Sequence, residues 1–171
     1  MEITTERLKL RPHGTKYLDT THRYASDLEN TKYMMALPSD SLEATKEFLE
    51  KCEKEQVKER PSFYEFAIIK DEKHIGAVSF YLNDTYDTAN IGWILDSNYH
   101  GYGYASEAAS ALVNFAIELG IKHFVAFCDS ENLASEGVMK KLGMTRVSLS
   151  GGRKNKGSEE ERKEYMYEMF F

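Results

Sequence analysis

The sequence predicts a single α+β domain in which helices pack against one mixed β-sheet. The chain has 171 residues, and a domain of ~150 residues buries roughly two-thirds of its unfolded surface, enough for a hydrophobic core. Segments that alternate apolar and polar residues are interleaved with segments of helical spacing. No linker or repeat divides the chain. We therefore expect one domain over residues 1–171, with about six to seven strands and about four helices.

The N-terminal third is expected to hold one strand followed by helices. Leu8–Arg11 alternates apolar and charged residues, which is typical of a strand that stops at Pro12. Apolar residues between positions 17 and 35 favour one or two short helices. Ser41 is a candidate N-cap, and the apolar stripe after it predicts a longer helix to about Gln56.

Three antiparallel strands are expected next. Phe63–Lys70 and His74–Tyr81 flank the polar residues 71–73 and predict a hairpin. A second turn at 83–85 leads to an expected strand over Ala89–Leu95.

The last third begins with an alanine-rich helix over Tyr104–Leu119, which Gly120 ends as a C-terminal cap. Its small residues allow the helix to lie close to the sheet. The elements expected after it are a buried strand, a short helix and two more strands: His123–Cys128, Ser135–Leu142, Met144–Leu149 and Tyr165–Phe171. The segment 150–162 is polar and is expected to be a mobile loop.

Composition excludes several classes of protein. The net charge of −6 and the absence of a basic stripe argue against nucleic-acid binding. No apolar run approaches the ~20 residues needed to cross a bilayer, and the N-terminus does not resemble a signal peptide. Two cysteines are too few for a disulfide framework, and the five histidines lack metal-ligand spacing. We expect a cytoplasmic protein without a metal or a membrane partner.

The most informative segment joins the strand Ala89–Leu95 to the helix at Tyr104 through a turn with two glycines. Gly101 and Gly103 allow positive φ and remove side chains that would block a close approach. The first N–H groups of the following helix, and the positive end of its dipole, point at this turn. The arrangement predicts a phosphate-binding turn.

Two phosphate-binding motifs can be tested by spacing. A P-loop requires Gly-Lys-Ser/Thr, whereas Gly103 is followed by Tyr104 and Ala105. A dinucleotide fingerprint would have its third glycine where Ser106 stands, although Asp129 closes the next strand as a ribose-binding acid would. The P-loop is excluded, and a dinucleotide-binding enzyme remains an alternative.

A third pattern fits better. Asn98–Gly103 resembles the Q/R-x-x-G-x-G/A loop that binds the pyrophosphate of coenzyme A in the GNAT superfamily of N-acetyltransferases, with Asn98 in place of Gln or Arg. Asp129–Ser135 and Leu142–Met144 are similar to the D-x-x-N-x-x-S and L-G-F segments of the branch that acetylates ribosomal-protein N-termini. The opening Thr5–Arg11 is similar to that branch's T-x-R-L-x-L-R. The resemblance spans nearly the whole chain.

This resemblance implies a GNAT fold whose strands Ala89–Leu95 and His123–Cys128 splay apart to hold acetyl-CoA. The first of these strands carries a bulge in the family, and its backbone pairs with the pantetheine arm. One backbone N–H there can polarise the thioester carbonyl. Asn132 would bond the same arm, or would cap the following helix. The implied cofactor-binding residues are Trp93, Ile94, Leu95, His100, Gly101, Tyr102, Gly103, Tyr104, Ala105 and Asn132.

The resemblance also points to a candidate proton donor. Many members of the superfamily use a Tyr at the position of Met139, which cannot donate a proton. The ribosomal-protein branch has a Ser where Ser135 stands, and a hydroxyl can protonate the leaving thiolate. Ser135 is therefore either the catalytic acid or a helix N-cap. Where the branch has a Glu that can act as base, this chain has Asn90, so Glu65, Glu164 or water remain as candidates.

We expect an acetyl-CoA-dependent N-acetyltransferase in which an amine attacks the thioester directly. The acceptor is a protein N-terminus or a small-molecule amine, and the protein is a monomer or a homodimer. Asn90 and Met139, which replace chemistry-bearing residues, leave a non-catalytic CoA-binding module as the alternative.

Overall fold

The computed structural model describes all residues from Met1 to Phe171. Eight strands form one sheet in the order β1-β2-β3-β4-β5-β6-β8-β7. The strands are β1 (Ile3–Thr4), β2 (Lys9–Pro12), β3 (Phe63–Lys70), β4 (Lys73–Leu82), β5 (Thr88–Leu95), β6 (His123–Asp129), β7 (Thr145–Lys154) and β8 (Glu161–Phe170). The helices are α1 (Leu18–Ala25), α2 (Leu42–Gln56), α3 (Tyr104–Glu118) and α4 (Leu133–Lys141), with short 3-10 turns at Thr15–Tyr17 and Ser97–Tyr99.

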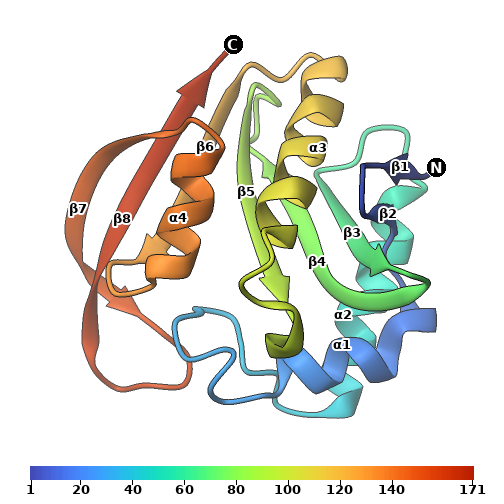
Figure 1. Cartoon of the computed structure of the whole chain (residues 1–171), viewed down its shortest axis with the longest axis horizontal. Helices are drawn as coiled ribbons and strands as arrows, with labels where there is room; N and C mark the ends of the chain where they lie inside the picture. Colours follow the sequence, from blue (N-terminus) through green and yellow to red (C-terminus); the bar gives the residue numbers. More distant parts are fainter.

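The sheet lies between two helical layers, with α3 and α4 on the face nearer the viewer in Figure 1 and α1 and α2 on the other. Alternation along the strands explains this sandwich. Phe66 and Phe80 point to the α3 side, where their rings pack against Phe115. Glu65 and Ser79, one residue away on each strand, are a cross-strand pair on the opposite face. Both faces of β3 and β4 are therefore covered.

Strands β5 and β6 diverge, as the family resemblance implies. They pair in parallel only from Thr88–Asn90 with His123–Val125, although the strands have 8 and 7 residues. Beyond Asn90, the edge of β5 that faces β6 has no strand partner. Figure 1 shows this opening between the two strands, with α3 and α4 on either side of it. The fold leaves an opening in the sheet directly before the glycine turn.

The expected fold class is confirmed, and most elements lie where the sequence places them. Ser41 caps α2, with its Oγ accepting the Ala44 N–H at 3.0 Å. Gly120 follows α3 with φ +94°, the left-handed conformation expected at a helix C-terminus. The prediction of helix between 17 and 35 is confirmed only for α1. The residues after α1 form an irregular segment instead. The Asn30 side chain donates to the carbonyls of Tyr24 and Leu95 and holds this segment against the end of β5.

The expected mobile loop over 150–162 is wrong for most of its length. Strand β7 continues to Lys154 and β8 begins at Glu161, which leaves a short turn between them. Arg153 and Asn155 are 8% and 2% exposed, so this polar segment is held by specific contacts. The eighth strand, β1, was not expected, because two residues are too few to show alternation.

None of the helices combines the length and the apolar composition needed to span a membrane.

Candidate active site

The turn between β5 and α3 is rigidly built. Asp96 is buried at the end of β5, where one carboxylate oxygen accepts the Asn98 N–H at 3.0 Å and the other lies 3.1 Å from Arg23 Nε. Gly101 and Gly103 have φ of +85° and +81°, a region that other residues rarely adopt. Gly103 is also the N-cap of α3. The two predicted glycines are therefore required by the backbone of the turn.

The turn presents a row of free backbone donors. The N–H groups from Gly101 to Ser106 have no hydrogen-bond partner in the protein, and the first one that α3 uses is Glu107 N–H, 3.1 Å from Gly103 O. Free N–H groups at the positive end of a helix dipole attract an anion such as a phosphate. His100 differs, since its N–H bonds Ser97 O at 3.3 Å and its ring lies 3.2 Å from Leu95 O. It anchors the turn.

Sequence reasoning did not single out Arg7, which contacts this turn from the segment between β1 and β2. Its guanidinium donates to Tyr102 O at 2.9 Å and to Glu107 at 2.6 Å, and lies 4.7 Å from the Tyr104 ring centroid. A Cβ at Gly103 would lie 3.5 Å from Arg7 Nη2. Arg7 thus braces the turn, and Glu107 pairs with its charge. It occupies the Arg position of the T-x-R-L opening, which was the available signal.

The backbone groups of β5 that are predicted to bind the cofactor are only partly free of other hydrogen bonds. The ladder between β4 and β5 runs in unbroken register from Gly76–Leu95 to Leu82–Ala89, so the expected bulge is absent. The carbonyl of Leu95 is already engaged by Asn30 Nδ2 at 2.9 Å and by the His100 ring. Trp93 and Ile94 lie on the stretch of β5 beyond its pairing with β6. The bulge is a family feature that this chain does not share.

Asn132 and Ser135 lie at the start of α4, on the other side of the opening. Asn132 is the N-cap, with Oδ1 accepting the Ser135 N–H at 3.2 Å. Ser135 is therefore inside the helix, and its expected alternative role as N-cap is wrong because α4 begins two residues before it. The Ser135 hydroxyl contacts Trp93, whose Nε1 lies 3.3 Å away. The two sides of the opening are joined at this point.

At Met139 and Asn90 this chain departs from the family pattern, and the structure shows where each side chain lies. Met139 is 0% exposed and packs in the main core beneath α4. Asn90 is exposed on β5 and pairs across the ladder with Tyr81. Neither side chain offers an acid or a base, so proton transfer must involve other residues.

Two carboxylates were candidates for the base, and the structure separates them. Glu164 is engaged by Arg153 Nη1 at 2.7 Å. Glu65 has no cationic partner; the Tyr81 hydroxyl lies 3.4 Å from its Oε2. Burial raises the pKa of Glu65 to about 8, against smaller lowering effects of Ser79 and Tyr81. The pKa of Glu65 thus lies well above the usual range of a carboxyl, and the residue is on the α2 side of the sheet.

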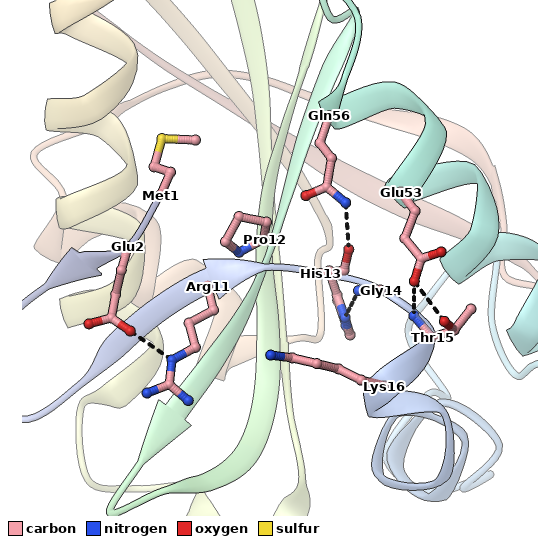
Figure 2. Close-up of a pocket in the computed structure, with 10 residues that line it drawn as sticks. All are labelled: Met1, Glu2, Arg11, Pro12, His13, Gly14, Thr15, Lys16, Glu53 and Gln56. Carbon is pink, nitrogen blue, oxygen red and sulfur yellow. Dashed lines mark hydrogen bonds and ion pairs between the residues drawn. The ribbon is translucent and has the colours of Figure 1, made fainter.

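A cavity of about 420 Å³ lies elsewhere, between the N-terminal segment, the end of β2 and α2 (Figure 2). Its charged groups are largely compensated. Arg11 pairs with Glu2 at 2.7 Å, and Glu53 accepts from the Thr15 N–H and hydroxyl at 2.6 and 2.7 Å. The cavity contains none of the predicted site residues. No group of three or more His, Cys, Asp or Glu side chains in the chain is arranged to hold a metal ion.

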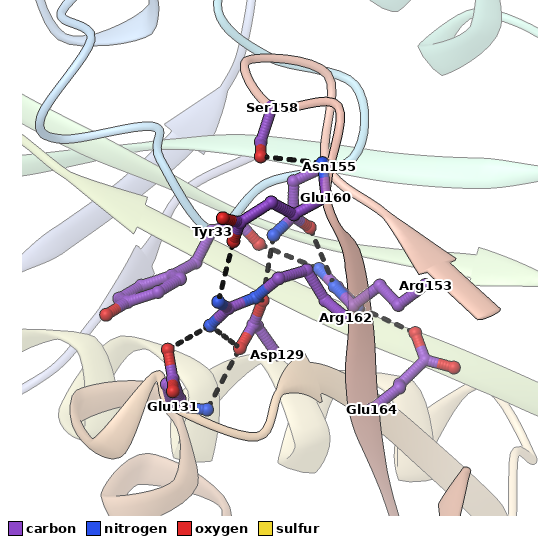
Figure 3. Close-up of polar contacts among 9 residues, drawn as sticks. All are labelled: Tyr33, Asp129, Glu131, Arg153, Asn155, Ser158, Glu160, Arg162 and Glu164. Carbon is purple, nitrogen blue, oxygen red and sulfur yellow. Dashed lines mark hydrogen bonds and ion pairs between the residues drawn. The ribbon is translucent and has the colours of Figure 1, made fainter. Parts of the chain in front are cut away.

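A polar network at the end of β6 fixes the β7–β8 hairpin (Figure 3). Asp129 is 0% exposed and accepts from Arg162 at 2.9 and 3.0 Å and from Asn155 at 2.8 Å. Burial alone would raise the pKa of Asp129, but these donors and the Glu131 N–H together lower it. Arg153 donates to Tyr33 O at 2.8 Å, in the segment between α1 and α2. The network ties three distant segments together beside the site.

Comparison with known proteins gives one family. The sequence profile described as the acetyltransferase (GNAT) domain matches residues 7–145. The protein named "Uncharacterized N-acetyltransferase YnaD" from Bacillus subtilis (strain 168) is 35% identical over 150 residues, which cover 85% of this chain and 84% of that protein.

Solved structures agree with this match. A GNAT-family acetyltransferase from Bacillus anthracis has a TM-score of 0.84 at 29% identity and covers 99% of this chain and 98% of its own. The ribosomal L7/L12 α-N-protein acetyltransferase RimL, solved with coenzyme A, has a TM-score of 0.87, at 21% identity, covering 100% of this chain and 98% of that one. The second likeness supports the fold alone.

Proposed function

This chain belongs to the GNAT family and is an N-acetyltransferase with acetyl-CoA as its acetyl donor; we propose that it transfers the acetyl group to an amine by direct attack on the thioester. The acceptor is a protein N-terminus or a small-molecule amine.

The observation that carries the proposal is the row of free N–H groups from Gly101 to Ser106. They fit the pyrophosphate of coenzyme A, because two phosphates need several donors and the protein as a whole is negatively charged. Arg7 holds the turn in place through its bond to Tyr102 O, while Glu107 pairs with its charge. The opening between β5 and β6 offers unpaired strand edge for the amide groups of the pantetheine arm, with Trp93, Ile94 and Asn132 along it.

In the proposed reaction, the nitrogen of a neutral amine forms a bond to the thioester carbon while the bond from carbon to sulfur breaks. Bound acetyl-CoA supplies the activated acetyl group. Backbone N–H groups of β5 at the opening stabilise the charge that develops on the carbonyl oxygen. The Ser135 hydroxyl gives its proton to the leaving thiolate and recovers one from solvent. Glu65, through water, accepts the proton that the amine nitrogen loses and returns it to solvent, so protons balance.

The role of Glu65 predicts a pH dependence. A base must be deprotonated to work, so kcat/KM should rise as the pH increases through the pKa of Glu65, about 8. In Glu65→Gln this ascending limb should be lost, and the rate at pH 8.5 should fall by about tenfold, below the usual range for a general base because water also carries protons. Both proteins are measured with one acceptor, so that the acceptor's own ionisation is common to both.

An unchanged pH profile in Glu65→Gln would show that Glu65 is not the base. Glu164→Gln is a poor comparison because it breaks an ion pair. Glu59→Gln, which changes an exposed carboxyl without hydrogen-bond partners, is the control and should leave the profile as it is.

The turn predicts how binding should respond to substitution. Acetyl-CoA at a hundredfold excess over its Kd should stabilise the folded protein by about 2.7 kcal/mol, measured as a rise in Tm, and NAD should not. Gly103→Ala cannot keep φ +81° without strain, so the N–H groups around it turn away. We expect Kd for acetyl-CoA to rise at least about tenfold, the equivalent of one lost hydrogen bond to a charged group.

Gly120→Ala is the matched control. Gly120 also has positive φ, +94°, and a Cβ added there would meet no atom within 4 Å, but it lies at the far end of α3. The Gly120→Ala protein should lose similar stability and keep its affinity. Equal affinities in Gly103→Ala and the wild-type protein, or equal stabilisation by NAD, would contradict the proposed cofactor site.

A further inference from the structure

The contact between Trp93 and Ser135 crosses the opening in the sheet. Trp93 extends from β5, and Ser135 lies in the first turn of α4, which follows β6. These strands have already diverged, because their pairing ends at Asn90 and Val125. The indole Nε1 is 3.3 Å from Ser135 Oγ, and both side chains are partly buried. No other side-chain hydrogen bond directly joins β5 to α4.

The chemistry of the two groups fixes the direction of this bond. An indole nitrogen carries a proton and can only donate, whereas a serine hydroxyl has one proton to donate and two lone pairs. Ser135 Oγ is therefore the acceptor, and its own proton is not used in the contact. A serine in a helix often donates to the carbonyl four residues earlier. Ser135 makes no such bond, and its hydroxyl has no second partner in the protein.

Both ends of Ser135 are thus held by the two sides of the opening. Asn132 Oδ1 accepts the Ser135 N–H and fixes the backbone, while Trp93 fixes the hydroxyl oxygen. The hydroxyl proton is the one polar group of Ser135 whose direction these two bonds do not fix on their own. A hydroxyl that already accepts a hydrogen bond is also a better donor, because hydrogen bonds in a chain polarise one another.

We propose that the side chain of Trp93 is a positioning residue: its N–H occupies a lone pair of Ser135 Oγ, so that the hydroxyl proton points into the opening toward the leaving sulfur. This inference rests on the proposed function. It adds a second role to Trp93, whose backbone is on the expected path of the pantetheine arm. The proton that Ser135 gives to the thiolate is replaced from solvent, and Trp93 keeps its own proton throughout.

The bond itself can be observed without any assay of activity. Trp93 is the only tryptophan, so its indole N–H gives one identifiable signal in a ¹H–¹⁵N spectrum of the labelled protein. In Ser135→Ala this signal should move upfield and exchange faster with water, because the acceptor is lost. Ser110→Ala makes the same change at an exposed position of α3 and should leave the signal in place. An identical indole signal in Ser135→Ala would overturn the proposal.

Kinetics test the consequence of the bond. Trp93→Phe keeps an aromatic ring but removes the N–H, and should lower kcat about fivefold with KM for acetyl-CoA within about twofold, which corresponds to about 1 kcal/mol of transition-state stabilisation. In the Ser135→Ala background the same substitution should have no further effect, because the positioned proton is already absent. Tyr64→Phe, which removes a hydroxyl without a hydrogen-bond partner from a half-buried aromatic, should leave kcat as it is.

The outcomes separate this inference from the proposed function. If the wild-type protein transfers acetyl groups but Trp93→Phe lowers kcat equally with and without the Ser135 hydroxyl, then Trp93 only packs and the inference is wrong. If the wild-type protein releases no thiol with any amine, the proposed function fails and the positioning role fails with it, whatever the indole signal shows.

Discussion

Replacing Ser135 with alanine should lower kcat by roughly 10- to 1,000-fold, the usual range for a general acid with allowance for a water molecule that substitutes for the hydroxyl. Thiols ionise near pH ~8.5, so at neutral pH the departing thiolate takes up a proton, which the Ser135 hydroxyl can supply. KM for acetyl-CoA should change little, because Asn132 still caps α4 and the glycine turn is untouched. Steady-state kinetics and a binding titration with acetyl-CoA measure the two effects separately.

The structure makes this variant a clean test. Since Asn132 is the N-cap, Ser135→Ala removes no cap and should not cost the ~1 kcal/mol of a lost cap. Alanine is also the better helix former by a few tenths of a kcal/mol, which offsets part of the lost contact with Trp93. Ser110→Ala is the matched control in α3. Full activity in Ser135→Ala would leave Ser135 as a structural residue.

Replacing Asp129 with alanine should destabilise the fold by about 3 kcal/mol, near the lower end of the range for breaking a buried ion pair. Asp129 is fully buried, so its loss leaves the Asn155 amide and part of the Arg162 guanidinium without an acceptor. Arg162 keeps exposed carboxylates as partners, which limits the cost. For a chain of this length Tm should fall by about 6–12 °C, measured by thermal unfolding.

Glu131→Ala provides the comparison, because Glu131 contacts the same guanidinium from an exposed position. Exposed ion pairs contribute about 0–1 kcal/mol, so Tm should fall by only a few degrees. Equal losses in the two variants would mean that burial of Asp129 does not decide the strength of the network. The lowered pKa of Asp129 also predicts how stability depends on pH. The stability that the ionised carboxylate contributes is fully present above the ordinary pKa of an aspartate, and it is lost as the pH falls from there through the lowered pKa of the folded protein.

Local sequence signals predict most of the fold. The hairpin of β3 and β4, the cap at Ser41 and the end of α3 at Gly120 are confirmed because each depends on neighbouring residues alone. The prediction of a loop over 150–162 is wrong because the order of this polar segment depends on Asp129, which is distant in sequence. Polarity predicts a loop only when nothing in the fold pairs with the polar groups.

The geometry of the candidate site is predicted in part, and what its residues bind stays a prediction. The glycine turn follows from positive φ and a helix N-terminus, both legible in the sequence. Arg7 and the contact between Trp93 and Ser135 are not foreseen, because each joins elements that come together only in the folded sheet. Asn132 and Ser135 are both candidate caps by sequence, and spacing alone does not decide where α4 begins.

The central claim is that this chain transfers an acetyl group from acetyl-CoA to an amine. The most direct measurement combines the purified protein with acetyl-CoA and a panel of protein N-terminal peptides and small amines. Free thiol is measured with a colorimetric thiol reagent, and acetylation of each acceptor is measured by mass spectrometry. We expect thiol release that depends on one class of amine, an acceptor heavier by one acetyl group for each thiol released, and a much slower reaction in Ser135→Ala. Binding of acetyl-CoA with no thiol released above the amine-free rate would contradict the claim, and would make the protein a non-catalytic CoA-binding module.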